Sequence, residues 1–567
     1  MNYRKPIRAL VLSIAAAVAS ALPSSADTGA GAYLAARSAE QQHDFAAASQ
    51  YYIRALTKDP GNRELMERAV LSLIGMGDIT RALPIARQLA GADPESQVAG
   101  TLLLAEAVRN NDFDAAYRIL REAGRLGPLI DGLSLAWVQA GQGRMSQALE
   151  SFDAVARQEG LQSFAAYHKA LALAMVGNLE AAEAILSGTA GPEIPATRRS
   201  IIARVEILSQ LERNREAIEL LYAAFGSDFD PGLARLRSRL AAGETLPLSI
   251  VRDARDGVAE VFFGVAGALM GEGNDGYTLL YTRITQYLRP DNEDAIILAA
   301  QLLERLGRYE LATAAYESIS PDSPAYEAAE LGRARTLRLA GDPEAAVEAL
   351  ERLAERFPDQ AAVHVALGDE LRRMKRYEEA GRAYSRAIAL YGQPEPSQWS
   401  VYFARGITYE RTDQWEKAEA DFRKALELEP DQPQVLNYLG YSYVEMNTNL
   451  DEALEMIRTA VQKRPDSGYI TDSLGWVLYR LGRYDEAVVQ MERAVELMPM
   501  DPILNDHLGD VYWAVGRQRE ARFQWSRALS LDPEEKDAAR IRRKLEVGLD
   551  AVLEEEGAEP LAHSNGG

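Results

Sequence analysis

The chain has 567 residues, of which 47% are hydrophobic and 26% are charged, and it contains no cysteine. The absence of cysteine excludes disulfides, thiolate metal sites and a cysteine nucleophile. The formal charge of -22 makes nucleic acid and acidic membrane surfaces poor partners, because both bind clustered Lys and Arg. The five histidines are too scattered in sequence to form a short metal-binding motif. Composition thus removes several chemistries without indicating a function.

The N-terminal segment has the pattern of an export signal. Three basic residues among the first eight precede an apolar run over residues 9–22, and the small residues Ser24 and Ala26 precede a possible cleavage site. We predict a cleaved signal peptide over 1–26, a mature chain that begins at Asp27, and a periplasmic location. An uncleaved anchor and an extracellular destination are the alternatives. The apolar run is shorter than the ~20 residues that span a bilayer, and we expect no transmembrane segment in the mature chain.

The rest of the chain repeats itself, in most places with a period of 34 residues. An alanine in the second half of each unit marks the register. These alanines are Ala48, Ala82, Ala116, Ala148, Ala182, Ala217, Ala312, Ala346, Ala380, Ala418, Ala453, Ala487 and Ala521. Such a period predicts stacked units, each of which buries its apolar face against its neighbours.

Each unit has the pattern of two helices joined by a turn. Apolar residues three and four positions apart, such as Ala418, Phe422 and Ala425, predict one buried helical face. Small residues on the first helix, such as Gly475, would let the second helix approach closely. A glycine before the second helix supplies the turn in seven units, at Gly77, Gly143, Gly177, Gly307, Gly341, Gly482 and Gly516.

These units resemble the tetratricopeptide repeat (TPR), strongly over residues 363–533 and recognisably over 33–192. The resemblance implies an all-α fold, a right-handed TPR superhelical solenoid of about 14 helix-turn-helix hairpins with a C-terminal capping helix. We predict the following organisation: 1–26, signal peptide; 27–225, N-terminal TPR array; 226–290, irregular region; 291–535, C-terminal TPR array; 536–556, capping helix; 557–567, disordered tail. The capping helix would turn four apolar residues, Ile541, Leu545, Leu549 and Val552, to one face, although a solvated helix is the alternative.

The C-terminal units are similar to a group of exported bacterial TPR proteins. The similarity lies in segments such as Leu436-Asn-Tyr-Leu-Gly-Tyr441 and Asp472-Ser-Leu-Gly-Trp476. This group includes outer-membrane lipoprotein adaptors that bind a carboxy-terminal processing protease and present cell-wall hydrolases to it. The present chain differs from them in lacking a lipid-accepting cysteine.

The sequence carries no convincing catalytic motif. A Gly271-x-Gly273-x-x-Gly276 match lacks the preceding strand of a dinucleotide site, so we interpret it as a turn between helices. We find no phosphate-binding loop, no His-Glu-x-x-His pair and no Gly-x-Ser-x-Gly elbow. We therefore predict a protein that is not an enzyme and uses no cofactor or metal, with an enzyme or enzyme subunit that uses an unrecognised site as the alternative.

The TPR resemblance implies a binding groove lined by the first helix of each hairpin. The lining positions lie three before, one after and four after the small central residue of that helix. We predict partner binding by Phe403, Ile407, Asn437, Tyr441, Asp472, Trp476, Tyr479, Asp506, Asp510 and Trp513. Aromatic residues beside acids suit a peptide with apolar and basic side chains, although one or two of the rings could instead pack against neighbouring helices. The predicted function is a protein-binding scaffold or adaptor in the bacterial cell envelope, whose partners would include a carboxy-terminal processing protease and cell-wall hydrolases.

Overall fold

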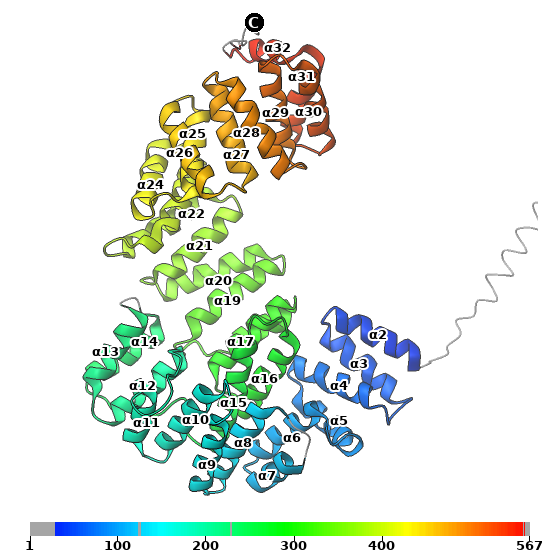
Figure 1. Cartoon of the computed structure of the whole chain (residues 1–567), viewed down its shortest axis with the longest axis vertical. Coiled ribbons are helices and arrows are strands. Elements are labelled where there is room, and N and C mark those ends of the chain that lie inside the picture. Colours follow the sequence, from blue (N-terminus) through cyan, green and yellow to red (C-terminus); the bar gives the residue numbers. More distant parts are fainter. Residues whose placement is uncertain (1–28, 123–125, 227–228, 559–560, 562–567) are drawn as a thin grey trace, which may run out of the picture. The chain divides into compact units, whose positions relative to one another are not determined.

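The computed structural model describes residues 29–122, 126–226, 229–558 and 561. The predicted signal peptide and most of the predicted tail therefore lie outside the described residues. The described residues form 31 α-helices, one short 3-10 helix and no β-strand. The chain divides into two compact units, Met1–Ala349 and Leu350–Gly567 (Figure 1). The predicted all-α solenoid of 14 helix pairs is confirmed, with α14 as an extra helix and α31 and α32 closing the series.

The helices of the first unit are α2 (Gly29–Gln41), α3 (Phe45–Leu56), α4 (Arg63–Met76), α5 (Ile79–Ala92), α6 (Gln97–Arg109), α7 (Phe113–Glu122), α8 (Pro128–Gly141), α9 (Met145–Ala156), α10 (Gln162–Met175), α11 (Leu179–Leu186), α12 (Arg198–Gln210), α13 (Asn214–Phe225), α14 (Pro231–Ala241), α15 (Ala254–Leu269), α16 (Asp275–Leu288), α17 (Glu293–Arg305), α18 (Tyr309–Glu317) and α19 (Tyr326–Leu339). The boundary between the units falls inside α20 (Pro343–Arg356).

The helices of the second unit are α21 (Ala361–Arg373), α22 (Tyr377–Leu390), η1 (Pro396–Gln398), α23 (Trp399–Glu410), α24 (Trp415–Leu428), α25 (Pro433–Glu445), α26 (Leu450–Lys463), α27 (Gly468–Arg480), α28 (Tyr484–Leu497), α29 (Pro502–Ala514), α30 (Gln518–Ser530), α31 (Glu535–Val547) and α32 (Leu549–Glu555). No helix in the described part of the chain has the length and apolar character needed to cross a lipid bilayer.

The turn inside each helix pair contains a residue with left-handed backbone geometry. The seven predicted turn glycines all have positive φ, from +70° at Gly307 to +91° at Gly341. In other pairs a residue with a side chain takes this conformation, namely His43, Asn111, Glu212, Lys375, Asp413 and Asn447. Gly271 and Gly273 of the glycine motif lie in the turn between α15 and α16, as predicted, whereas Gly276 lies in the first turn of α16.

The two helices of a pair meet where the first helix carries a small residue. A Cβ atom at Gly475 would lie 2.7 Å from Cγ of Met491, and one at Gly368 would lie 2.7 Å from Cε1 of Tyr384. Both distances are shorter than van der Waals contact, so a Cβ atom at either position would force the facing side chain to shift. The close approach that the sequence predicts is therefore confirmed.

The regular repeat is interrupted between α13 and α15. α14 is followed by an extended segment over residues 243–253 instead of a partner helix. Side chains of α12 hold this segment in place: Ser209 Oγ accepts a hydrogen bond from Leu246 N at 2.9 Å, and the Glu206 carboxylate accepts one from Ser249 N at 2.8 Å.

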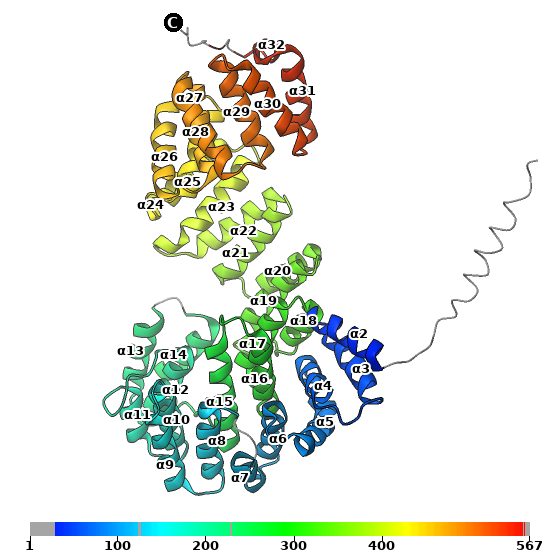
Figure 2. The same cartoon turned by 45° about the vertical axis from the view of Figure 1, so that its right-hand side comes forward.

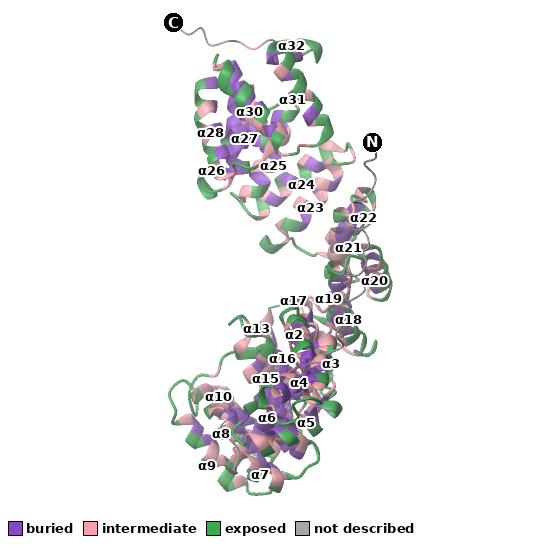
Figure 3. Ribbon diagram, turned by 90° about the vertical axis from the view of Figure 1, so that its right-hand side faces the viewer, coloured by how far each residue is buried: buried purple, intermediate pink, exposed green. Residues whose placement is uncertain are grey.

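The pair α15/α16 lies against the first helices of the early pairs. α15 packs on α8 and α10, and α16 packs on α4 and α6 (Figures 1 and 2). A Cβ atom at Gly257 of α15 would overlap the indole of Trp137 on α8, and the Arg109 guanidinium lies 4.3 Å from the ring centroid of Tyr287. Figure 3 shows buried residues gathered where these helices meet. The inner face of the first unit is thus filled by the chain itself.

The C-terminal cap consists of two helices, whereas the sequence suggested one. Gly548 separates α31 from α32 with a φ of +88°, a backbone conformation that ends the first helix. Of the four apolar residues predicted to face the core, Ile541, Leu549 and Val552 are buried and Leu545 is partly buried. The cap therefore packs against the core, as expected, but with a sharp turn in its middle.

Candidate functional site

The first helices of the last four pairs, α23, α25, α27 and α29, form a surface that we call the C-terminal groove. Consecutive members of this set from α25 onward contact one another directly. A cavity of about 480 Å³ opens among them. Its wall combines three tyrosines with three carboxylates, Tyr438, Tyr441, Tyr469, Glu410, Glu445 and Asp472. Asn437 and His507 also line it.

Each carboxylate of the cavity has a protein partner. Glu410 accepts a hydrogen bond from the Tyr438 hydroxyl at 3.1 Å and pairs with Arg411 at 3.3 Å. Asp472 contacts Nδ1 of His507 at 3.1 Å. Burial and the neighbouring Glu445 and Asp472 carboxylates raise the pKa of Tyr441, so its hydroxyl stays protonated. Three acids against one arginine and one histidine leave the cavity with an acidic character.

Three rings form a stack at the edge of this cavity. Trp476 lies parallel to His507, with ring centroids 4.2 Å apart, and to Tyr479, at 4.8 Å. The Trp476 indole N–H donates to Glu445 Oε1 at 3.0 Å. Trp476 is only partly buried, whereas Tyr479 is buried. The stack thus fixes the positions of Glu445 and His507 relative to the cavity.

The two predicted binding residues of α23 lie outside the 480 Å³ cavity. Phe403 and Ile407 line a separate cavity of about 250 Å³, which extends to α21 and Tyr384 of α22. Phe403 also packs edge-on against Tyr438, with ring centroids 5.6 Å apart. Of the ten predicted residues, the 480 Å³ cavity therefore gathers Asn437, Tyr441 and Asp472.

The predicted residues of α29 are covered by the cap. Trp513 is 6% exposed, and a Cβ atom at Gly548 would lie 2.7 Å from its ring. Its indole N–H donates to Asp550 Oδ2 at 2.9 Å. The sequence analysis expected Trp513 to face the groove; in the structure α31 and α32 occupy that space.

The two acids of α29 also face the cap. Lys544 of α31 is fully buried and its ammonium lies 2.9 Å from Asp506 and 2.7 Å from Asp510. Asp510 further accepts the Trp525 indole N–H at 2.8 Å. The expectation that Asp506 and Asp510 open onto the groove is corrected in the same way, because an internal lysine neutralises them.

Several residues that line the 480 Å³ cavity do not occupy any of the three repeat positions predicted from the sequence. Tyr438, Ser473 and His507 all lie two residues before the small central residue of their helix, and Glu445 lies five after it. Positions -2 and +5 lie three and four residues from the predicted position +1 and share its helix face, so a wider stripe of the repeat would have found these residues.

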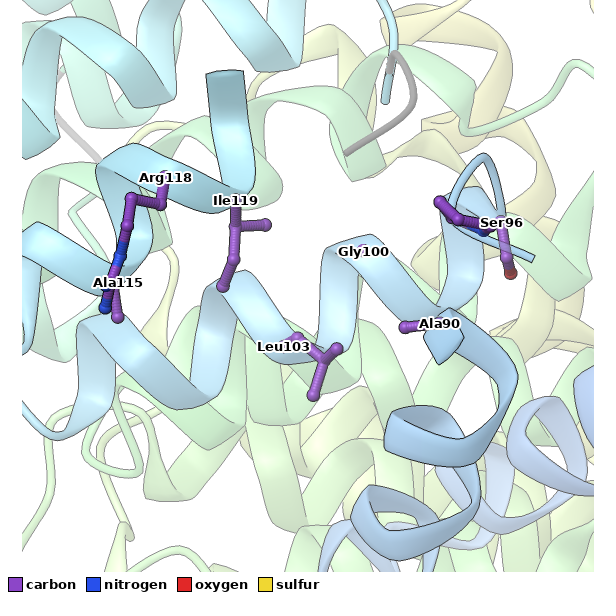
Figure 4. A pocket seen from close by; sticks show the side chains of 8 residues that line it. Ala90, Ser96, Gly100, Leu103, Ala115, Arg118 and Ile119 are labelled. Carbon is purple, nitrogen blue, oxygen red and sulfur yellow. The ribbon is translucent and has the colours of Figure 1, made fainter. Parts of the chain in front are cut away.

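Other cavities in the described part of the chain have different linings. One of about 450 Å³ lies among α5, α6 and α7, bordered by small and apolar residues such as Ala90, Leu103 and Ile119, with Arg118 as its charged residue (Figure 4). Another, of about 560 Å³, lies beside α10, α12 and α15. Over the described residues, no group of three or more His, Asp or Glu side chains is placed to hold a metal ion.

Family models described as tetratricopeptide repeat match much of the chain. One matches residues 33–96, 133–193 and 403–468, and three others match residues 359–430, 327–370 and 472–501. Together these matches cover just over half of the sequence.

Similar proteins match only in part. A TPR repeat-containing protein of Pseudomonas aeruginosa is 28% identical over 169 residues, 30% of this chain and 28% of that protein. A Lipoprotein NlpI homolog of Haemophilus influenzae is 37% identical over 87 residues, 15% of this chain and 27% of that protein. The chain thus spans less than a third of the length of either relative.

Solved structures are similar at low identity. The Cut9–Hcn1 hetero-tetramer of the APC/C matches at a TM-score of 0.39 and 15% identity, over 92% of this chain and 96% of that chain. YrrB, described as a TPR protein with an unusual peptide-binding site, matches at a TM-score of 0.29 and 21% identity, over 35% of this chain and 99% of that chain.

Proposed function

Because this chain belongs to the tetratricopeptide repeat family, whose members typically act as non-enzymatic interaction scaffolds, we propose that it binds a protein partner in its C-terminal groove. The partner segment would carry basic and apolar side chains. The observation that carries this proposal is the 480 Å³ cavity, in which tyrosines and carboxylates converge from consecutive first helices. Such a lining can bury an apolar side chain and pair with a cationic one.

The chain itself provides an example of this recognition. At the last repeat, Lys544 of the cap lies between Asp506 and Asp510 and above the Trp525 ring, 5.8 Å from its centroid. Asp506 lies three residues before the central glycine of α29, and Asp472 occupies the same position in α27. One repeat earlier no cap helix intervenes, and Asp472, which pairs with His507, lines the cavity that a basic side chain of a partner would enter.

The setting of this activity is proposed to be the bacterial cell envelope. The basic and apolar N-terminal pattern supports export to the periplasm, and the similarity of part of the chain to a lipoprotein homologue supports an envelope role. In that setting the protein would act as an adaptor that brings clients, such as cell-wall hydrolases, to a carboxy-terminal processing protease.

The groove assignment is tested with a matched pair of peptides. One peptide alternates Lys with Phe and Leu, and the other carries Glu in place of every Lys. Fluorescence anisotropy should detect binding of the basic peptide to the full chain and none of the acidic one. Tyr441→Ala should weaken binding by roughly tenfold or more, the loss expected for an aromatic anchor. Phe523→Ala is the control, because Phe523 of α30 is 64% exposed and outside the cavity.

Two results would contradict this assignment. Equal binding of both peptides would remove the role of the carboxylates. Equal affinity of Tyr441→Ala and the unmodified protein would place the binding surface elsewhere. The location is tested separately, by intact mass of the protein recovered from periplasmic extract. A mass that corresponds to a start at Asp27 is expected, and a full-length mass would contradict export with cleavage.

A further inference from the structure

A cavity of about 560 Å³ in the first unit is built differently from the groove. It lies between α10, α12, α15 and the segment before α12. Its wall is mainly aromatic and apolar, formed by Phe164, Tyr167, Ile194, Pro195 and Phe263. Gly264 and Gly267 of α15 also border it, and a Cβ atom at either would meet no atom within 4 Å. The side of α15 that faces the cavity is therefore left unfilled.

A buried histidine supplies a free hydrogen-bond donor to this cavity. His168 is 2% exposed, and its Nδ1 accepts the Trp137 indole N–H at 3.0 Å. An accepting Nδ1 carries no proton, so the proton of the neutral ring sits on Nε2. Within the described residues no group accepts from Nε2, and the ring lines the cavity. Nε2 is therefore available to donate to a ligand that enters the cavity, and this hydrogen bond would add to the affinity of such a ligand.

The charges at the cavity wall cancel one another. Arg199 donates to both Glu260 oxygens, at 2.9 and 2.6 Å, and also pairs with Asp294. Arg198 pairs with Asp230 at 2.6 Å. Burial lowers the pKa of His168 to about 4, so the ring is neutral at pH 7. The lining thus offers no unpaired charge to attract an ionic ligand.

We propose that this cavity binds an uncharged, mainly aromatic small molecule through one hydrogen-bond acceptor that receives the Nε2 proton of His168. Its volume falls in the range of about 300–1,000 Å³ that is typical of ligand sites. Aromatic walls favour a ring-bearing ligand through stacked and edge-on contacts. The site is formed by the first unit alone and does not depend on peptide binding in the C-terminal groove.

The ligand chemistry is tested with two molecules of the same shape. Benzophenone carries a carbonyl acceptor, and 1,1-diphenylethylene replaces the carbonyl oxygen with a CH₂ group. Both should displace the neutral fluorophore N-phenyl-1-naphthylamine from the full chain. Benzophenone should bind roughly two- to tenfold more tightly, the net effect of one hydrogen bond. It should also shift the ¹⁵N resonance of His168 Nε2, which a purely apolar contact would not do.

The location is tested by filling the cavity. Gly264→Leu places a side chain in the open space and improves helix propensity, so the melting temperature should not fall while fluorophore binding is lost. Gly91→Leu is the matched control, because Gly91 is an exposed helical glycine of α5 with open space around its Cβ position. Photolysis with benzophenone, which inserts into nearby C–H bonds, should label Phe164, Ile194 or Phe263.

Three outcomes would overturn the proposal. These are unchanged fluorophore binding by a folded Gly264→Leu protein, photolabels confined to residues outside the cavity, or tighter binding of 1,1-diphenylethylene than of benzophenone. The basic groove peptide should leave the fluorophore in place. Displacement by that peptide would show that the fluorophore sits in the groove, which would also overturn this site while leaving the groove assignment intact.

Discussion

The first helices of the repeats are covered to different extents in the two units. In the first unit, α4, α6, α8 and α10 are covered by α15 and α16 of the same chain. In the second unit, α25 and α27 border an open cavity, and α29 is covered by the cap. The same repeat therefore builds a closed core in one place and leaves an open cavity in another. The difference depends on whether a later segment of the chain packs against the first helices.

The first prediction concerns the covered end of the second unit, where the effect should be largest. Lys544→Met removes the buried ammonium that pairs with both Asp506 and Asp510, and leaves only the longer contact of 3.5 Å between Arg540 and Asp510. Loss of one partner from a buried ion pair costs about 3–5 kcal/mol of unfolding free energy. Denaturant unfolding and hydrogen exchange should show this loss in α29 and the cap. The control is Arg543→Met, which removes exposed ion pairs with Glu546 and Glu555 and should change the free energy of unfolding little. Equal losses in both variants would mean that the cap does not cover α29 in solution.

The second prediction compares glycines at close helix contacts in the two units. Gly257→Leu forces a side chain into the fully buried Trp137 ring, and should cost about 3 kcal/mol, the upper end for overpacking. Gly475→Leu meets the flexible Met491 side chain, which can adjust, so about 1–2 kcal/mol is expected. Thermal unfolding measures both. If the Gly257 variant were as stable as the unmodified chain, α15 could not be packed into the inner face of the first unit.

The local elements could be predicted from the sequence because their signals are local. The 34-residue period, the turn glycines and the apolar spacing give the helix pairs, and all seven turn glycines adopt positive φ. The groove positions were partly predicted: Asn437, Tyr441 and Asp472 meet in one cavity, since the repeat places them on the same helix face.

The long-range contacts could not be predicted in this way. Trp476 and Trp513 lie one and four residues after the central glycines of successive repeats, yet Trp513 is covered by helices about 35 residues further along the chain whereas Trp476 is only partly buried. Likewise, nothing in the degenerate repeat around Gly257 indicates that it returns to Trp137. Such contacts depend on the superhelix bringing distant segments together, which the period alone does not specify.

The third prediction concerns a buried carboxylate of the filled first unit. Burial raises the pKa of Glu206 to about 7, against an ordinary value of 4.5. Between these values the folded chain binds more protons than the unfolded chain, so the contribution of Glu206 to stability falls as the pH rises from about 4.5 to 7. Glu206→Gln removes the ionisation, and should make the protein about 3 kcal/mol more stable than the unmodified chain at pH 8. Denaturant unfolding at several pH values checks this difference.

The matched control is Glu219→Gln on α13, whose carboxylate is largely exposed. This variant removes an exposed carboxylate in place of a buried one. The pH dependence that His168 adds to stability has the opposite sign. Burial lowers the pKa of His168 to about 4, so its contribution to stability is lost as the pH falls from 6.5 toward 4. The two groups offset each other near pH 5–6 in the unmodified chain, so the Glu206→Gln variant should show a steeper rise in stability over that range. A parallel profile for Glu206→Gln and the unmodified chain would contradict the burial of this carboxylate in the first unit.

The smallest effect is expected in the C-terminal groove, where protonation of His507 should change the affinity for the basic peptide. Burial lowers the pKa of His507, but the Asp472, Asp506 and Asp510 carboxylates raise it by more, so the net pKa lies above its ordinary 6.5. Below that pKa the imidazolium cancels the charge of Asp472, and above it the groove becomes more acidic. The affinity for the basic peptide should therefore increase with pH, by about 1 kcal/mol or roughly fivefold across the transition. His507→Gln should flatten this dependence, whereas His43→Gln in the first unit should leave it unchanged. An affinity that falls as the pH rises would mean that the peptide does not contact the Asp472 side of the cavity.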